Sequence, residues 1–172
     1  PRPITSNIAE VASVKILVTP TVLEAVILEA NLIKKYWPKY NVISRDDRSF
    51  IYLVVTKDAY PKLLTKRGTD LAAETAKTYR AIFGPFLSLK TLTAALKILR
   101  RIFHWSNCRP GAKRPCFYYH LGQCPGVCTG EVSARDYRRQ VIKNIVWFFV
   151  GRKNKIILSL KKEMQAAAKK DH

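Results

Sequence analysis

The sequence lacks several features that mark common classes of protein. Its longest apolar runs are interrupted by Lys or Arg and are too short to span a bilayer, which excludes a transmembrane helix. It has no charged start followed by an apolar core and a small-residue cleavage site, so no secretory signal is predicted. Internal repeats and low-complexity linkers are missing as well. These absences favour a folded cytoplasmic protein.

Acidic residues are scarce. The 172 residues include 12 Asp and Glu against 31 Lys and Arg, which gives a formal net charge of +19. This excess indicates a polyanionic partner, with nucleic acid the first expectation and an anionic membrane surface the second. A basic protein of ribosomal type is the simpler alternative. Hydrophobic residues make up 48% of the chain, enough for a packed core.

Residue patterns predict an α+β fold whose sheet lies before about residue 86. A helix is predicted over 22–35, because apolar residues recur on one face and Thr19-Pro20-Thr21 supplies a start. The polar, Ala-rich stretch 70–77 is predicted to be a connection. Alternating β-branched and aromatic residues predict strands over 14–19, 41–47, 50–56, 60–67 and 79–86, with 50–67 forming a hairpin.

The remainder of the chain is predicted to be mainly helical. A helix from Ser88 carries an apolar stripe, and its other faces are expected to hold Lys90, Lys97, Arg100 and Arg101. Ser133 and Asp136 resemble a capping pair that opens another helix, which Gly151 ends. The inward residues of that helix are predicted to be Tyr137, Val141, Ile145 and Phe148. Asn154 is predicted to cap a last helix.

Cysteine is absent except in one segment, which contains all four: Cys108, Cys116, Cys124 and Cys128, spaced C-x7-C-x7-C-x3-C. Disulfides need an oxidising compartment, and buried free cysteines would not be confined to one segment rich in Pro and Gly. A metal site explains the crowding, because thiolate ligands must converge on one point. Zinc and an iron–sulfur cluster both accept four thiolates, and the lack of a C-x2-C pair leans against a zinc ribbon.

Charged residues and histidines surround the cysteines. Lys113, Arg114 and Arg109 are predicted to lower the thiol pKa values and to offset the charge of a four-thiolate site. His104 and His120 flank the segment, but four cysteines already complete a tetrahedral site, so ordinary packing is expected for both.

A second candidate site lies on the first helix. Glu29, with an amide such as Asn41 nearby, has the oxygen ligands that hold Mg²⁺ and leave positions open for water. The alternative is that Glu29 faces solvent and pairs with Lys34 or Lys35.

Basic residues interleaved with aromatics suit a nucleic-acid backbone, although the aromatics could equally be core. These basic residues are Lys34, Lys35, Lys39, Arg45 and Arg48.

Several long motifs, in order, resemble UvrC, the nuclease subunit of the bacterial UvrABC excision-repair system. They are TPTVLEAVILEANLIKKYWPKYNV from Thr19, RDDRSF from Arg45, FGPF from Phe83 and RPCFYYHLGQC from Arg114. The resemblance covers essentially the whole chain.

The resemblance implies a GIY-YIG nuclease fold that makes the incision 3′ to a lesion in damaged double-stranded DNA with one divalent metal, Mg²⁺ or Mn²⁺. By position, Glu29 corresponds to the metal-binding glutamate and Asn41 to the active-site asparagine. The cysteines correspond to a [4Fe–4S] motif, with zinc as the alternative. UvrB, and UvrA in the pathway, are the implied partners, with no membrane, and the SOS response to DNA damage is the implied setting.

Four regions are expected on this basis. Residues 1–60 form the later part of a GIY-YIG-type domain with a small antiparallel sheet, and 61–103 a strand and helix connection. Residues 104–130 bind the cluster, and 131–172 are helical and lead to a segment that contacts UvrB.

Departures from the family pattern limit the activity expected of these residues alone. The tyrosine-bearing strands and the Arg helix of the fold are expected before Pro1, so the 172 residues by themselves are predicted to be inactive. The alternative function is a non-catalytic nucleic-acid-binding module stabilised by its four-cysteine site.

Overall fold

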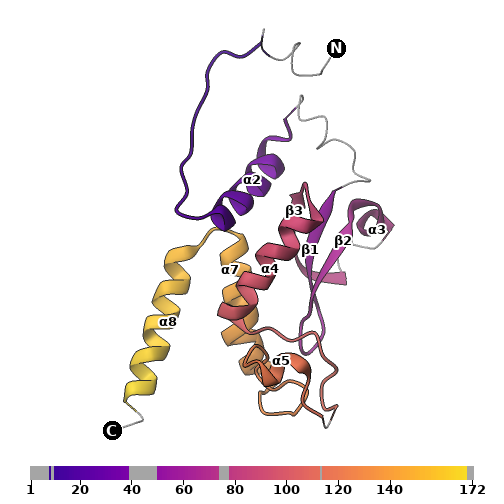
Figure 1. Cartoon of the computed structure of the whole chain (residues 1–172), viewed down its shortest axis with the longest axis vertical. Helices are drawn as coiled ribbons and strands as arrows, with labels where there is room; N and C mark the ends of the chain where they lie inside the picture. The colour runs from indigo at the N-terminus through magenta and orange to yellow at the C-terminus, as the bar shows by residue number, and fades with distance from the viewer. Residues whose placement is uncertain (1–7, 9, 39–49, 74–77, 113, 170–172) are drawn as a thin grey trace. The chain divides into compact units, whose positions relative to one another are not determined.

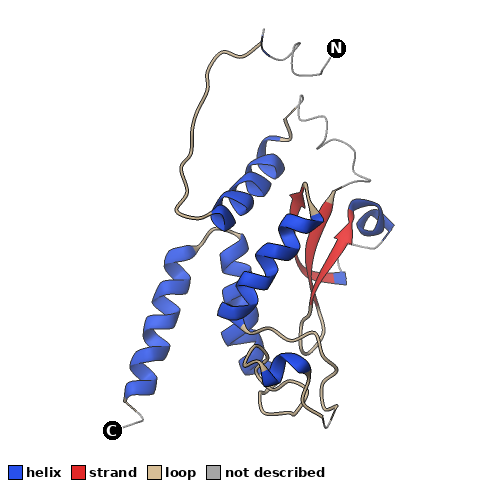
Figure 2. Cartoon of the chain, in the orientation of Figure 1, coloured by secondary structure: helices blue, strands red, loops and turns tan. Residues whose placement is uncertain are grey.

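The computed structural model describes residue 8 and residues 10–38, 50–73, 78–112 and 114–169. The chain divides into two compact units, Pro1–Val55 with Leu64–Leu96, and Thr56–Leu63 with Lys97–His172. Helices and strands both occur in the described residues, which confirms the predicted α+β class (Figure 2). None of the described helices is both long and apolar enough to cross a membrane.

The sheet has three antiparallel strands in the order β2-β1-β3: β1 (Ile51–Thr56), β2 (Leu63–Arg67) and β3 (Tyr79–Phe86) (Figure 1). The central position of β1 explains why Leu53, Val54 and Val55 are all 0% exposed, since side chains on both faces of this strand are covered. The strands predicted over 50–56 and 79–86 are confirmed, and the one predicted over 60–67 is confirmed from Leu63 onwards, whereas 41–47 lies outside the described residues. Part of the predicted connection over 70–77 is instead helix α3 (Gly68–Ala73).

Helix α2 (Val22–Tyr36) confirms the helix predicted over 22–35. The Thr21 hydroxyl caps it by accepting a hydrogen bond from the Glu24 N–H at 3.2 Å. Trp37 ends it in the left-handed conformation, and its N–H donates to the Ile33 carbonyl at 2.8 Å. The apolar face packs against β3 and buries Ile27, Ala30 and Ile33.

The strand predicted over 14–19 is wrong, because these residues form no regular structure. Val14, Ile16 and Val18 are more than four-fifths exposed. A strand needs a neighbour to take its backbone hydrogen bonds, and none of the described strands lies beside this segment. Alternation alone therefore misled the prediction.

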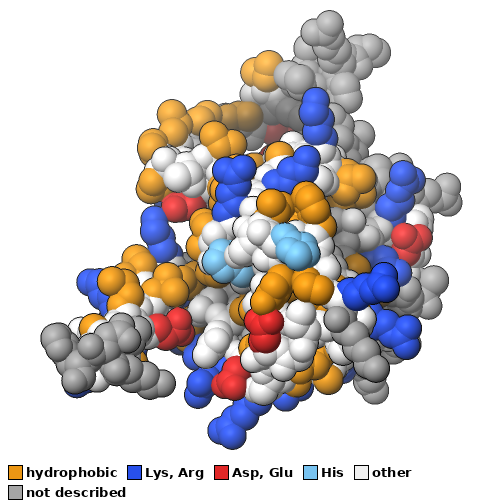
Figure 3. Space-filling view, turned by 60° about the horizontal axis from the view of Figure 1, so that its bottom comes forward, with side chains coloured by type: hydrophobic (Ala, Val, Ile, Leu, Met, Phe, Trp, Pro, Cys, Tyr) orange, Lys and Arg blue, Asp and Glu red, His pale blue; other side chains and the backbone are white. Residues whose placement is uncertain are grey.

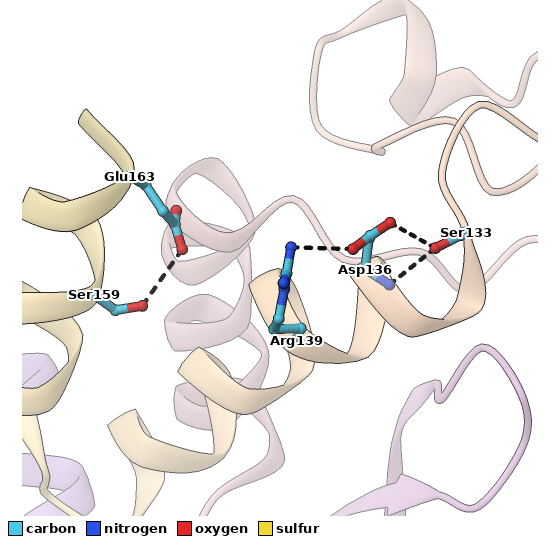
Figure 4. A network of polar contacts seen from close by, with 5 residues as sticks. All are labelled: Ser133, Asp136, Arg139, Ser159 and Glu163. Atoms are coloured by element: carbon cyan, nitrogen blue, oxygen red, sulfur yellow. Dashed lines mark hydrogen bonds and ion pairs between the residues drawn. The ribbon is translucent and has the colours of Figure 1, made fainter. Parts of the chain in front are cut away.

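The second unit contains the end of helix α4 (Leu89–Phe103), short helix α5 (Phe117–His120) and a helical run that starts at Ser133. That run comprises α6 (Ala134–Asp136), a π-helical segment η3 (Tyr137–Ile142) and α7 (Lys143–Phe149). The predicted cap is confirmed, since the Ser133 hydroxyl accepts from the Asp136 N–H at 3.0 Å and donates to its carboxylate at 2.7 Å (Figure 4). Asp136 also pairs with Arg139 at 3.2 Å.

The π-helical segment changes which side chains face inward. Tyr137, Val141 and Ile145 are buried as predicted, but Phe149 is buried in place of the predicted Phe148. A π-helical turn holds more residues than an α-helical turn, so the buried face moves towards later residues. Gly151, with φ +74°, follows α7, and α8 (Lys153–Ala168) begins one residue before Asn154. The prediction that Asn154 caps this helix is therefore wrong.

Tyr137 joins three segments of the second unit through one hydroxyl. Its side chain is 0% exposed, and the hydroxyl accepts from the Ser106 N–H at 2.9 Å and lies 3.2 Å from the Pro61 carbonyl. The Asn107 side chain makes a reciprocal pair with the Leu63 backbone, at 3.2 and 3.1 Å. These bonds fix the backbone that leads into Cys108.

Candidate metal centre

The cysteine segment folds back on itself through tight turns. Cys116 precedes α5, and the chain then turns so that the Gln123 N–H donates to the Tyr118 carbonyl at 2.7 Å. The Gly126 carbonyl accepts from the N–H groups of Gly130 and Glu131 at 2.9 and 3.0 Å, and from the Thr129 hydroxyl at 3.0 Å. Gly126 has φ +81°, a conformation that favours glycine. These turns bring the second pair of cysteines back to the first.

The four predicted ligands converge. The Sγ atoms of Cys108, Cys116, Cys124 and Cys128 all lie within 4.8 Å of one another, and all four thiols are free. Cys124 and Cys128 are buried, and the other two are half-buried. A tetrahedral zinc ion with four sulfur ligands at about 2.3 Å needs sulfur atoms about 3.8 Å apart. The observed arrangement therefore fits a four-thiolate metal centre.

Hydrogen bonds and burial make the thiols unequal. Burial raises the pKa of Cys108 to about 12, against the opposing effect of the Ser106 hydroxyl 2.6 Å from its Sγ. Burial also raises the pKa of Cys116. Burial disfavours the Cys124 thiolate too, but hydrogen bonds from Ser106 and from the backbone of Gly126 and Val127 prevail and lower its pKa. Cys124 is thus more easily ionised than Cys108 or Cys116.

The residues that flank the cysteines act differently from the prediction. Arg109 and Arg114 are exposed, and the pKa values of Cys108 and Cys116 are raised rather than lowered. Lys113 lies outside the described residues. His104 and His120 are exposed and do not belong to the four-thiol group, and the His104 Nε2 lies 2.9 Å from the Arg101 carbonyl.

The cation buried near the cysteines is Arg100, which was predicted to be exposed. Only 8% of this residue is exposed. Burial lowers its pKa, and the negative charges of Tyr118, Tyr137, Cys124 and Cys116 act in the opposite direction. A signal in the sequence could have identified it. Arg100 follows Leu96 by four residues and precedes Phe103 by three, so it shares the apolar face of α4.

An exposed surface of the cysteine segment was also missed. Phe117 and Leu121 are 71% and 51% exposed, and Tyr118 is 42% exposed. Arg109 and Arg114, from the same segment, are exposed as well. Because these five residues are exposed and belong to one short segment, we call them the aromatic–basic surface. Hydrophobic and histidine side chains lie among Lys and Arg side chains on the face shown in Figure 3.

The second candidate site is only partly described. Glu29 is exposed on α2 and is one of the residues that line a pocket of about 190 Å³, together with Val26, Pro85 and Thr91 among others. Within the described ranges it makes no ion pair with the exposed Lys34 or Lys35, although the Lys35 ammonium lies 4.9 Å from the centre of the Tyr36 ring. Asn41, Lys39, Arg45 and Arg48 lie outside the described residues. Of the residues described, only the cysteines form a group of three or more possible metal ligands.

Comparison with known proteins identifies both halves of the chain. Residues 50–146 match the family model described as the UvrC/Cho excinuclease middle domain, and residues 2–42 match that of the UvrC-like GIY-YIG domain. No solved structure matches significantly.

Curated relatives named UvrABC system protein C match almost the full chain. The one from Carboxydothermus hydrogenoformans is 37% identical over 159 residues, which are 90% of this chain and 25% of the relative. The one from Caldanaerobacter subterraneus is 35% identical over 168 residues, 94% of this chain and 26% of the relative. That from Methanospirillum hungatei is 34% identical over 158 residues, 92% and 29% respectively. The chain thus spans about a quarter of the length of these relatives.

Substitution of Gly126 by Ala should destabilise the cysteine segment. A Cβ at this position would lie 2.8 Å from the Glu131 Cβ, whereas one at Gly130, with nearly the same φ of +82°, would meet nothing within 4 Å. Both variants suffer the left-handed strain, of about 1 kcal/mol, and Gly126→Ala adds overpacking of about 1–3 kcal/mol. Chemical denaturation of both variants measures the difference, and equal losses would contradict the crowding at Gly126.

Proposed function

Because the chain belongs to the UvrC/Cho excinuclease family, we propose that it is part of the nuclease subunit of a UvrABC nucleotide-excision-repair system. In this proposal the intact subunit cuts the DNA strand 3′ to a lesion. The observation that carries it is the order of the two family matches, with GIY-YIG and middle-domain segments following one another along one chain. Damaged double-stranded DNA is the substrate, UvrB and UvrA are the partners, and the cytoplasm is the location.

We assign the regions of the chain accordingly. Residues 1–60 belong to the nuclease domain, 61–103 connect it to the cysteine-rich segment 104–130, and 131–172 lead towards the segment that contacts UvrB. The net charge of +19 supports a nucleic-acid substrate. A role in the SOS response would follow from the repair function.

The incision site would use Glu29 and Asn41. The exposed carboxylate of Glu29 can hold Mg²⁺ or Mn²⁺, which supplies electrostatic stabilisation of the phosphate and of the leaving oxygen when it is bound. Lys34 and Lys35, both exposed on the same helix, are available to phosphates, and Lys39, Arg45 and Arg48 are proposed to continue this contact.

The four cysteines would hold a [4Fe–4S] cluster, as the family resemblance implies. The sulfur separations of at most 4.8 Å suit a single tetrahedral zinc ion, whereas a cluster would require the thiols to spread further apart. In either case the main role of the centre would be structural, because its four ligands would join parts of a segment that has little regular structure.

A second function is favoured by the aromatic–basic surface. Exposed aromatic rings beside cations can stack on unpaired bases while the cations contact phosphates. This supports the alternative of a nucleic-acid-binding module, and the two functions are compatible in one subunit.

Incision tests the nuclease function. A chimera in which this chain replaces the matching quarter of the Carboxydothermus hydrogenoformans relative should cut a lesion-containing duplex in the presence of UvrA, UvrB and Mg²⁺. Glu29→Gln should reduce the 3′ incision about 100-fold, because a metal ligand is lost. Glu24→Gln on the same helix is the matched control. Undiminished incision by Glu29→Gln would refute its role, and nicking by the 172 residues alone would refute their predicted inactivity.

Metal analysis tests the centre. After anaerobic purification, iron and sulfide near four atoms each per chain would support the cluster, and about one zinc would support the single ion. Cys124→Ser should lower the bound metal at least tenfold, since one of four ligands is lost. A wild-type chain with neither metal would exclude the proposed centre.

Binding to single-stranded DNA tests the aromatic–basic surface. Phe117→Ala should weaken binding by about 1–3 kcal/mol, because one stacking contact is removed. Met164→Ala in α8 is the control, since Met164 is also 71% exposed. Fluorescence anisotropy at fixed salt gives both affinities, and equal affinities of the two variants would rule out stacking on Phe117.

A further inference from the structure

Arg100 is a buried cation that has no carboxylate partner among the described residues. Long charged side chains are rarely buried unless they are paired with an opposite charge, yet this one is only 8% exposed. Its Nη1 atom is buried and has no hydrogen-bond partner among the described residues. The ion pair found in the described ranges, Arg139 with Asp136, lies elsewhere and is exposed. No carboxylate in the described part of the chain therefore explains why Arg100 is buried.

Two aromatic rings hold the guanidinium in place. Its central carbon lies 3.9 Å from the centre of the Tyr118 ring and 4.6 Å from that of Trp105. Trp105 is 3% exposed, so this contact is inside the unit. The rings stabilise the positive charge through their faces but accept no conventional hydrogen bond. Within the described part of the chain, the buried Nη1 group of Arg100 still lacks a hydrogen-bond acceptor.

The groups whose negative charge would favour the Arg100 cation belong to the four-cysteine centre or to residues that contact its segment. They are the thiols of Cys124 and Cys116 and the hydroxyls of Tyr118 and Tyr137. Tyr118 belongs to α5, two residues after Cys116, and Tyr137 bonds to the backbone of Ser106, two residues before Cys108. The buried charge thus lies among the elements that position the ligands.

A loaded four-thiolate centre needs such a charge. Four thiolates around a doubly positive ion or cluster core leave a net charge of about −2 in a partly buried site. Burying this charge without compensation is costly. Arg109 and Arg114 are exposed to solvent. Among the described residues, Arg100 is therefore the buried cation that lies near the cysteine segment.

We propose that Arg100 is the buried counter-charge of the four-cysteine centre and stabilises the bound metal through its positive charge. This inference rests on the proposed metal centre but not on whether the metal is iron or zinc. Trp105 and Tyr118 act as positioning residues for the guanidinium, and its N–H groups remain to donate to a thiolate or sulfide sulfur of the loaded centre. Arg100 is a positioning residue and takes no part in the incision.

The test measures metal retention by the anaerobically purified chain. Arg100→Met keeps the length and apolar stem of the side chain but removes the charge, and Arg100→Lys keeps the charge. Metal loss to an excess of chelator should be about 10- to 100-fold faster for Arg100→Met than for wild type. Arg100→Lys should stay close to wild type. Arg101→Met, an exposed neighbour on the same helix, should have no effect.

Results that differ from these expected ones would overturn the role proposed for Arg100. Wild-type retention in Arg100→Met would show that the charge is not needed, and equal losses in Arg100→Met and Arg100→Lys would show that only the shape of arginine matters. If Arg100→Met does not fold, as judged by circular dichroism, Arg100→Gln replaces it in the comparison with Arg100→Lys. A wild-type chain that binds no metal overturns the proposed centre and this inference together, whereas a metal-loaded wild type with unaffected Arg100 variants overturns only the inference.

Discussion

Four thiols that lie within 4.8 Å of one another impose a charge constraint on the whole second unit. As neutral thiols they can share the space, and burial raises the pKa values of Cys108 and Cys116 accordingly. As thiolates they repel one another and need positive charge both between them and around them. A metal supplies the charge between them. Arg100, whose burial no carboxylate in the described residues explains, is placed to supply the charge around them.

Polar groups inside the unit fix the position of the first ligand. The backbone that leads into Cys108 is held by the Tyr137 hydroxyl and by the Asn107 side chain, and the Ser106 hydroxyl lies 2.6 Å from the Cys108 sulfur. Buried hydrogen bonds of this kind add modest stability but strongly penalise displacement of either partner. They therefore keep the first ligand in position although the loops that follow have little regular structure.

Much of the fold was predictable because the patterns were local. Helix α2 followed from its apolar periodicity and the Thr21 cap, and β1 from its run of β-branched residues. The segment 14–19 has the same alternation but no strand beside it in the described residues, and pairing is not encoded in alternation. The shift from Phe148 to Phe149 came from a π-helical segment that periodicity does not reveal. Arg100 is buried although its residue type favours an exposed face, because it lies on the apolar face of α4.

The two candidate sites differ in how their residues are distributed along the chain, and this decides how far each could be predicted. All four thiols lie within one short segment, so their convergence required only turns, and spacing predicted it without knowledge of the fold. Glu29 is exposed on α2, and among the described residues it belongs to no group of three or more possible metal ligands. A single carboxylate acquires catalytic meaning only from groups that distant segments bring to it. The role proposed for Glu29 therefore rests on the family resemblance, whereas the proposed four-cysteine centre rests on its own geometry.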